Sequence, residues 1–181
     1  MNLAASLDHI GDVLNNKVYN QAVFEWNVLD IIELTVNWDQ NRNQTFEIFD
    51  YNQSLDLILG EEFKVLDGVL NGSDGLFGQF KKDYFMIISD HSEPVIINNR
   101  FSDPYGYHLD GTRYSFTFGS KTPDTYLTIA HELGHSAFGF EDNTYKVRQP
   151  LNLMNHVQQS DYTKRIWLLK EQWETIQKTG E

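Results

Sequence analysis

Residues 122–142 read TPDTYLTIAHELGHSAFGFED, and this stretch contains the strongest structural signals in the chain. A threonine that can cap a helix, a proline at the first helical position and an acid in the first turn predict that a helix begins at residues 122–124. We expect this helix to run to about Phe138. It should stop near Gly139, because glycine can adopt the positive φ that ends a helix and turns the chain back.

The predicted helix contains the pattern HExxH at residues 131–135. Residues four apart lie on one helix face, so the imidazoles of His131 and His135 can reach a single zinc ion. Glu132 lies next to the first histidine and can reach a water molecule on the metal without ligating the metal itself. This is the position of a general base.

Zinc in a catalytic site usually has three protein ligands and a water molecule, so a third ligand must come from after the helix. Asp142 is the candidate that we favour, since it follows the turn expected at Gly139. Glu141 is one residue away and is the main rival. Glu171 and Glu174, on the expected terminal helix, are more distant alternatives.

These residues carry a resemblance to a known family. HELGHSAFGFED resembles the zinc-binding consensus of the metzincin metallopeptidases, HExxHxxGxxH, with one residue inserted before the glycine and an aspartate where the third histidine usually falls. Leu153, Met154 and Asn155 resemble the Met-turn of that superfamily, in which the methionine packs beneath the metal site. The resemblance covers about residues 112–176, and the HELGH-x-AF form is also similar to metallopeptidase domains of bacterial secreted or toxin-like proteins.

The resemblance implies a metzincin-like α+β fold with a twisted mixed sheet, long helices, an active-site helix and a small C-terminal lobe. It implies a single metallopeptidase domain over residues 1–181, with an upper lobe at 1–139 and a lower lobe at 140–181. The metal would be Zn²⁺, bound by His131, His135 and Asp142, and the activity would be that of a zinc-dependent endopeptidase with Glu132 as its base. His156 falls where some metzincins place a tyrosine that touches the zinc or the oxyanion, so it is a second catalytic candidate.

The same resemblance suggests a bacterial effector or toxin that is secreted or delivered by a specialised export system, although the sequence shows no signal peptide. Its expected partners are a protein or peptide substrate and an inhibitor or immunity protein, and we expect a monomer. The substrate would lie extended along a sheet edge, for which residues 95–98 are the candidate. The alternative function is a catalytically inactive, metal-stabilised binding module. His131 and His135 could also be hydrogen-bonded core residues.

Hydrophobic periodicity predicts the remaining elements. A helix over residues 3–22 follows from Leu3, Leu7, Ile10, Leu14 and Val18 on one stripe. Strands are expected at 32–38, 45–51, 84–89 and 95–98, a weak helix at 60–70, and a hairpin whose turn is the Asp-Gly pair at 110–111. A terminal helix is expected to begin near residues 160–161 and to place Ile166, Leu169, Trp173 and Ile176 on one face.

Composition limits the other functions. The 181 residues, 40% of them hydrophobic, suit one folded domain, and the net charge of −12 opposes binding to nucleic acid. The chain has no cysteine, so a metal must be held by histidine and carboxylate, and no apolar run is long enough to span a membrane. His9, His91 and His108 lack metal-ligand spacing and are expected to be structural. A cleft could be lined by three tyrosines, although most aromatic residues of a chain like this belong to the core or the surface: Tyr105, Tyr107 and Tyr162.

Overall fold

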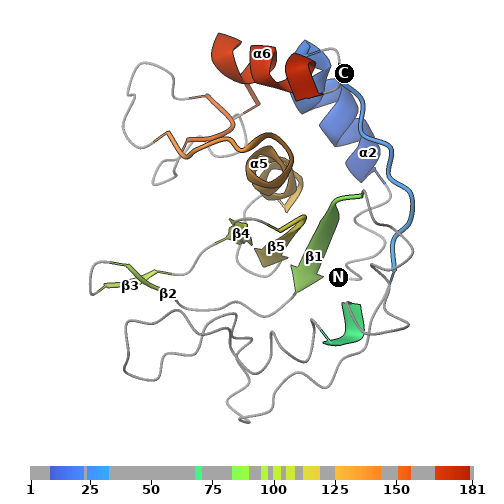
Figure 1. Ribbon diagram of the computed structural model, residues 1–181. Helices are drawn as coiled ribbons and strands as arrows, with labels where there is room; N and C mark the ends of the chain where they lie inside the picture. Colours follow the sequence, from blue (N-terminus) through green and yellow to red (C-terminus); the bar gives the residue numbers. More distant parts are fainter. Residues whose placement is uncertain are drawn as a thin grey trace.

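The computed structural model describes residues 9–22, 24–32, 68–70, 83–89, 95–97, 100–102, 105–108, 112–118, 125–143, 151–155 and 166–179. These residues form an α+β arrangement, in which a small sheet and several helical segments pack around a central helix (Figure 1). Of the strand expected at 32–38, residue 32 is described and is not in a strand, and residues 33–38 lie outside the described residues. The strand expected at 45–51 and the helix start expected at 122–124 also lie outside them. Of the helix expected at 60–70, residues 68–70 are described and are helical.

Within the described residues, three strands form the main sheet, in the order β1-β5-β4. β1 (Phe85–Ser89) and β5 (Tyr114–Phe118) are parallel, with Phe85 opposite Tyr114 and Ser89 opposite Phe118. β4 (Gly106–His108) is antiparallel to β5, with His108 opposite Ser115. The antiparallel pairing of the two strands of the predicted hairpin is therefore confirmed, while its turn at residues 110–111 lies outside the described residues. Among the described strands, β4 lies at one edge of the sheet.

A second, two-stranded antiparallel sheet consists of β2 (Val95–Ile97) and β3 (Arg100–Ser102). The strand expected at 95–98 therefore exists. It belongs to a different sheet from the strands that pack against the central helix. Among the described strands, the edge beside that helix is β4.

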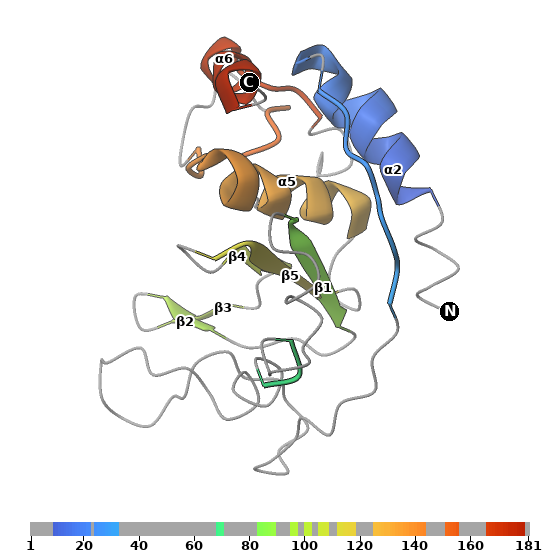
Figure 2. The ribbon, with the colours of Figure 1, turned by 45° about the vertical axis from the view of Figure 1, so that its right-hand side comes forward.

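The central helix is α5 (Thr125–Phe138). It ends where the sequence predicts, because Gly139 has a φ of +63° and its backbone N–H donates to the carbonyl of His135 at 2.9 Å. Figure 2 shows α5 lying between the sheet on one side and helices α2 (Ile10–Val13) and α6 (Lys170–Thr179) on the other. The residues of the HExxH pattern are thus held in the middle layer of the described structure.

The described part of the N-terminal segment, residues 10–22, is helical but is not a continuous α-helix, and residues 3–8 of the expected helix lie outside the described residues. It consists of α2 (Ile10–Val13), a π-helical segment (Leu14–Val18) and a 3₁₀ segment (Tyr19–Ala22). The periodicity of the sequence predicts the buried stripe that includes Leu14 and Val18 but contains no signal for the change in helix type. The buried hydroxyl of Tyr19 donates a hydrogen bond of 2.6 Å to the carbonyl of Ala130, and burial raises the pKa of this hydroxyl above its ordinary range.

The terminal helix α6 (Lys170–Thr179) begins later than the sequence suggests. The expectation that Ile166 and Leu169 lie on this helix is wrong, because the chain before Lys170 makes other backbone hydrogen bonds. Trp167 donates to the carbonyl of Leu151 at 3.0 Å and accepts from Leu153 at 2.8 Å. The helix is then capped by the side chain of Gln172, which accepts the N–H of Leu169 at 2.8 Å.

The described core joins the faces of α5, the N-terminal segment, the chain around Met154 and α6. Its largest fully buried side chains are Tyr19, Phe116, Phe118, Ile129, Leu153, Met154, Ile176, Val18 and Asn152. None of the helices in the described part of the chain is long and apolar enough to cross a lipid bilayer.

Candidate metal centre

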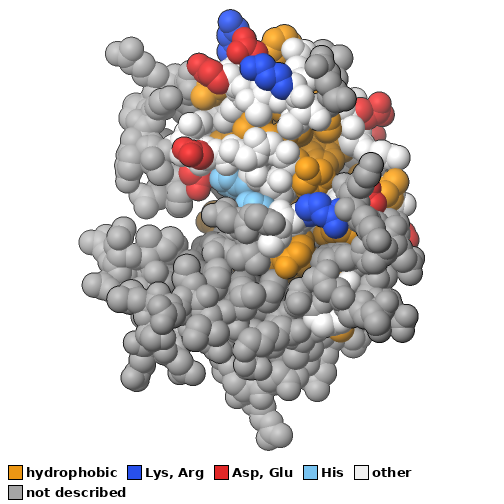
Figure 3. All heavy atoms as spheres, viewed as in Figure 1, with side chains coloured by type: hydrophobic (Ala, Val, Ile, Leu, Met, Phe, Trp, Pro, Cys, Tyr) orange, Lys and Arg blue, Asp and Glu red, His pale blue; other side chains and the backbone are white. Residues whose placement is uncertain are grey.

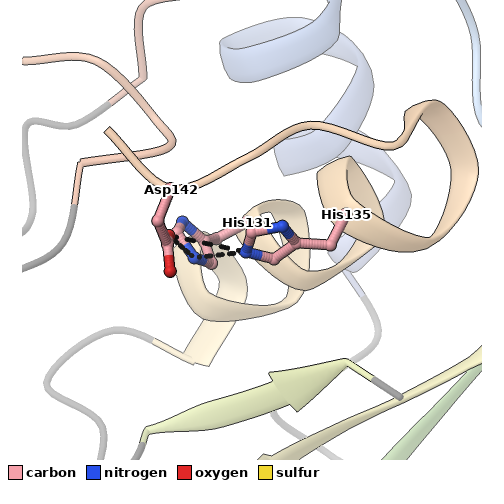
Figure 4. Close-up of side chains that lie close together, drawn as sticks. All are labelled: His131, His135 and Asp142. Carbon is pink, nitrogen blue, oxygen red and sulfur yellow. Dashed lines mark hydrogen bonds and ion pairs between the residues drawn. The ribbon is translucent and has the colours of Figure 1, made fainter. Parts of the chain in front are cut away.

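His131, His135 and Asp142 direct three possible ligand atoms towards one point at the C-terminal half of α5 (Figure 4). The two histidine Nε2 atoms are 3.1 Å apart. Oδ1 of Asp142 lies 3.2 Å from Nε2 of His131 and 3.5 Å from Nε2 of His135. Among the described residues, these three could hold a metal ion, and we call them the metal-ligand cluster.

The spacing of these atoms can be compared with the geometry of a bound ion. Zinc binds histidine nitrogen and carboxylate oxygen at about 2.0–2.2 Å, which separates neighbouring ligand atoms of a tetrahedral site by about 3.3–3.6 Å. The separation of 3.5 Å falls in this range, and those of 3.1 and 3.2 Å lie about 0.1–0.2 Å below it. The residues therefore fit a metal ion with little rearrangement.

Backbone carbonyls orient both histidines. Nδ1 of His131 lies 2.9 Å from the carbonyl oxygen of Leu153, and Nδ1 of His135 lies 2.5 Å from that of Phe140. A carbonyl can only accept, so each Nδ1 carries the proton and donates it. In the neutral ring the lone pair is then on Nε2, the atom that faces Asp142, which is the tautomer that a metal requires.

The turn after α5 positions the third ligand. Asp142 follows Gly139 by three residues, and its neighbour Asn143 is fixed to the chain around Met154. The N–H of Asn143 donates to the carbonyl of Met154 at 2.7 Å, and its side-chain amide donates to Oδ1 of Asn152 at 2.7 Å. Asn152 also accepts the N–H of Met154 at 2.9 Å, so one buried amide joins the two segments.

The rival acids lie elsewhere. The structure brings Asp142 to the two histidines, whereas Glu141 is exposed and is outside the ligand cluster. On α6, Glu174 forms an ion pair with Lys170 at 3.4 Å, and Glu171 is exposed. Among the described residues, Asp142 is the third member of the cluster.

Met154 is fully buried and packs against α5 within the HExxH pattern. A Cβ at Gly134 would lie 2.9 Å from Sδ of Met154 and 3.1 Å from a ring carbon of Phe140. Glycine at position 134 therefore allows the methionine to approach the helix between the two histidines. This is the packing role that the sequence predicts for Met154.

Glu132 is buried, with 5% of its surface exposed, and it faces the edge strand. A Cβ at Gly106 of β4 would lie 2.5 Å from Oε1 of Glu132 and 2.7 Å from its Cγ. The carboxylate therefore lies directly against the backbone of β4, which only glycine permits at this distance. The sequence contains Gly106 but gives no sign that it faces Glu132.

His108, which we expected to be structural, lies beside the metal-ligand cluster. Its ring is parallel to that of His135, with an angle of 9° between the planes and 6.3 Å between the centroids. Its Nδ1 is 3.3 Å from the hydroxyl of Ser115, and that hydroxyl donates to the carbonyl of Glu132 at 3.3 Å. Sequence spacing could not identify this residue, because it reaches the cluster through the sheet and not through the helix.

Electrostatic interactions favour opposite charges on the ligands when no metal is bound. Burial opposes ionisation of Asp142, but hydrogen bonds from His131 and His135 outweigh it and hold the pKa of this carboxyl below its ordinary range. Burial also opposes protonation of His135. The hydrogen bond to Asp142, the charge of Glu132 and the carbonyl of Phe140 nevertheless raise the pKa of this imidazole above 6.5. A proton on Nε2 of His135 and a cation at the cluster would therefore compete for the same position.

The cluster is open to solvent on one side. The side chains of His131 and His135 are 13% and 17% exposed, and that of Asp142 is 36% exposed. In Figure 3, histidine side chains are visible at the surface beside acidic ones.

The remaining candidate residues lie either outside the described residues or away from the metal-ligand cluster. His156, His91 and Tyr162 lie outside the described residues, as does the side chain of Tyr107. Tyr105 is half-buried and packs against the core. His9 is on the surface, 3.8 Å from Asp12, and has no part in the cluster.

Comparisons of this chain with models of protein families, with curated proteins and with solved structures gave no match. The geometry of the site and the resemblance of its motifs therefore remain as the indications of function.

Proposed function

We propose that this protein is a zinc-dependent endopeptidase. The observation that carries the proposal is the spacing of three ligand atoms from His131, His135 and Asp142, which matches three corners of a tetrahedral zinc site. A site with three protein ligands leaves a fourth position for water or substrate, and the partial exposure of the cluster is consistent with access to that position.

Zinc bound there would polarise a scissile carbonyl and make water a better nucleophile. Glu132 accepts the proton of the attacking water and returns it to the leaving amine, so that peptide hydrolysis is balanced in protons. Its location one residue from His131 and its buried environment support this role. The acidic third ligand, Asp142, offsets part of the positive charge of the metal.

The position of β4 indicates how a peptide would bind. β4 is the edge strand that packs beside α5, and an extended peptide can add to a sheet edge by main-chain hydrogen bonds. We therefore place the substrate along β4 and not along residues 95–98. An extended chain on this edge passes Gly106 and then His108, close to Glu132 and His135.

The order of parts around the site supports a metzincin-like fold. The helix that contains HExxH ends at Gly139, which has a positive φ, and Asp142 follows as the third ligand. The buried Met154 packs beneath the histidines, and α6 is the last described helix. These parts resemble the active-site helix, the third-ligand segment and the Met-turn of the metzincins. The role as a secreted effector or toxin is proposed on that resemblance alone.

The proposal is tested with the purified protein, its Glu132→Gln variant and a matched Glu141→Gln control. We expect about one zinc per chain in all three by elemental analysis. Digestion of a peptide library should occur with the wild type and with Glu141→Gln, whereas Glu132→Gln should cleave no peptide, because an amide cannot accept the proton. A wild type that binds zinc and cleaves nothing would favour the metal-stabilised binding module. A protein that binds no zinc would refute both functions.

A further inference from the structure

We propose that His108 is a substrate-binding residue of this site, in which Nε2 of its imidazole accepts a backbone N–H of the bound peptide next to the scissile bond. This inference rests on the proposed endopeptidase function. It assigns to β4 a side-chain contact with the substrate in addition to the main-chain pairing already described.

The first argument is the position of His108. Its ring is stacked on His135 with centroids 6.3 Å apart, a separation within the range of interacting aromatic rings. Within the described residues, the ligand atoms that lie within 4.8 Å of one another belong to His131, His135 and Asp142. His108 therefore lies next to His135 and outside the group of possible metal ligands.

The second argument is the register of β4 along α5. Residues two apart in a strand share a face, so Gly106 and His108 both face α5. Gly106 lies against Glu132, and His108 lies against His135, which is almost one turn further along the helix. A peptide on the edge of β4 would therefore pass the general base and then the imidazole of His108.

The third argument is the orientation of the imidazole. The hydroxyl of Ser115 has one hydrogen, which it donates to the carbonyl of Glu132 at 3.3 Å. The same oxygen is 3.3 Å from Nδ1 of His108, and it must accept this second hydrogen bond. Nδ1 then carries the proton, so the neutral ring has its lone pair on Nε2 and is an acceptor at the end away from Ser115. The main-chain group that an acceptor binds is the peptide N–H.

Two substitutions separate this role from a structural one. His108→Asn retains an amide that can donate to Ser115 but has no atom at the position of Nε2. His108→Gln is long enough to place its carbonyl oxygen near that position, but it cannot also donate to Ser115. If the imidazole binds the peptide, Gln should replace it better than Asn. If it only supports the fold, Asn should replace it better than Gln.

Peptide binding is measured in the Glu132→Gln background, where the peptide is not cleaved, with a fluorescent peptide that the wild type cleaves in the library. His108→Asn should weaken binding about tenfold, which is the loss expected for one hydrogen bond, and His108→Gln should weaken it less. The control is His9→Asn, at an exposed histidine, which should bind as tightly as the parent. Zinc content and the absorption spectrum of the cobalt-substituted protein should not change in any of the three.

The outcomes distinguish the two proposals. A zinc-loaded wild type that cleaves no peptide overturns the proposed function and with it this role of His108. A wild type that cleaves peptides, together with unchanged binding in His108→Asn, overturns only the role of His108. Loss of zinc or a changed cobalt spectrum in both His108 variants would instead make the residue a metal ligand, which also overturns the inference.

Discussion

Gly106→Ala is the substitution that most directly tests the arrangement of Glu132. The added methyl group would lie 2.5 Å from Oε1 and 2.7 Å from Cγ of Glu132, and 2.8 Å from Cγ2 of Thr128, whereas ordinary contacts are 3.4 Å or longer. Either the glutamate or β4 must therefore move by about 1 Å, and a displacement of that size in an active site can reduce the rate about 100-fold. Overpacking should also lower the free energy of unfolding by about 1–3 kcal/mol.

The assay compares kcat/KM, zinc content and thermal stability of Gly106→Ala with those of Gly68→Ala. Gly68 is a matched control because a methyl group there meets no atom within 4 Å. We expect Gly106→Ala to retain its zinc, since none of the metal ligands is in its way, and to lose about two orders of magnitude in kcat/KM. Each kcal/mol lost should lower Tm by about 2–4 °C for a domain of this size. Full activity in Gly106→Ala, or loss of zinc in parallel with loss of activity, would refute the close contact between β4 and Glu132.

Three further predictions concern the ligands and the core. Calorimetric titration should show that Asp142→Ala loses zinc and that Asp142→His retains it. Glu141→Ala should bind zinc like the wild type. If Glu141→Ala loses zinc and Asp142→Ala retains it, Glu141 is the ligand. Tyr19→Phe should lower the free energy of unfolding by about 1 kcal/mol in urea, because it removes a buried hydrogen bond to Ala130, and an unchanged midpoint would contradict that bond. The raised pKa of His135 should stabilise the metal-free protein below about pH 6.5, and this stabilisation should be lost as the pH rises through the pKa of the folded state. Zinc affinity should rise as the pH rises over the same range, because the proton on His135 competes with the metal. If the melting temperature of the metal-free protein does not fall as the pH rises over this range, the raised pKa of His135 is contradicted.

Local signals in the sequence predicted the elements that depend on neighbouring residues. The end of α5 follows from Gly139, and the antiparallel pairing of β4 with β5 agrees with two β-rich segments on either side of an Asp-Gly pair that lies outside the described residues. The cluster of His131 and His135 follows from helical periodicity, and Asp142 follows from the turn after the helix. In each case, the residues that form the feature lie close together in the sequence.

The features that the sequence did not predict depend on contacts between distant segments. The predicted start of α6 was wrong because the backbone of Trp167 forms hydrogen bonds with the backbone of Leu151 and Leu153. Hydrophobic periodicity along the sequence cannot reveal these contacts. His108 reaches His135 through strand pairing across β5, and Gly106 faces Glu132 for the same reason. The positions that shape the site from the sheet side therefore required the tertiary structure.

The three ligands fall within 12 consecutive residues, from 131 to 142, and this compactness has a consequence for the order of folding. Closing a short loop between His135 and Asp142 costs little chain entropy, so a metal ion can join them before distant segments have paired. The bond from His131 to the carbonyl of Leu153 spans 22 residues, so closing its loop costs about 1 kcal/mol more in chain entropy and we expect it to form later. Zinc present during refolding should therefore act early as a nucleus for the end of α5, and the chain around Met154 should dock onto a loop that the metal has already closed.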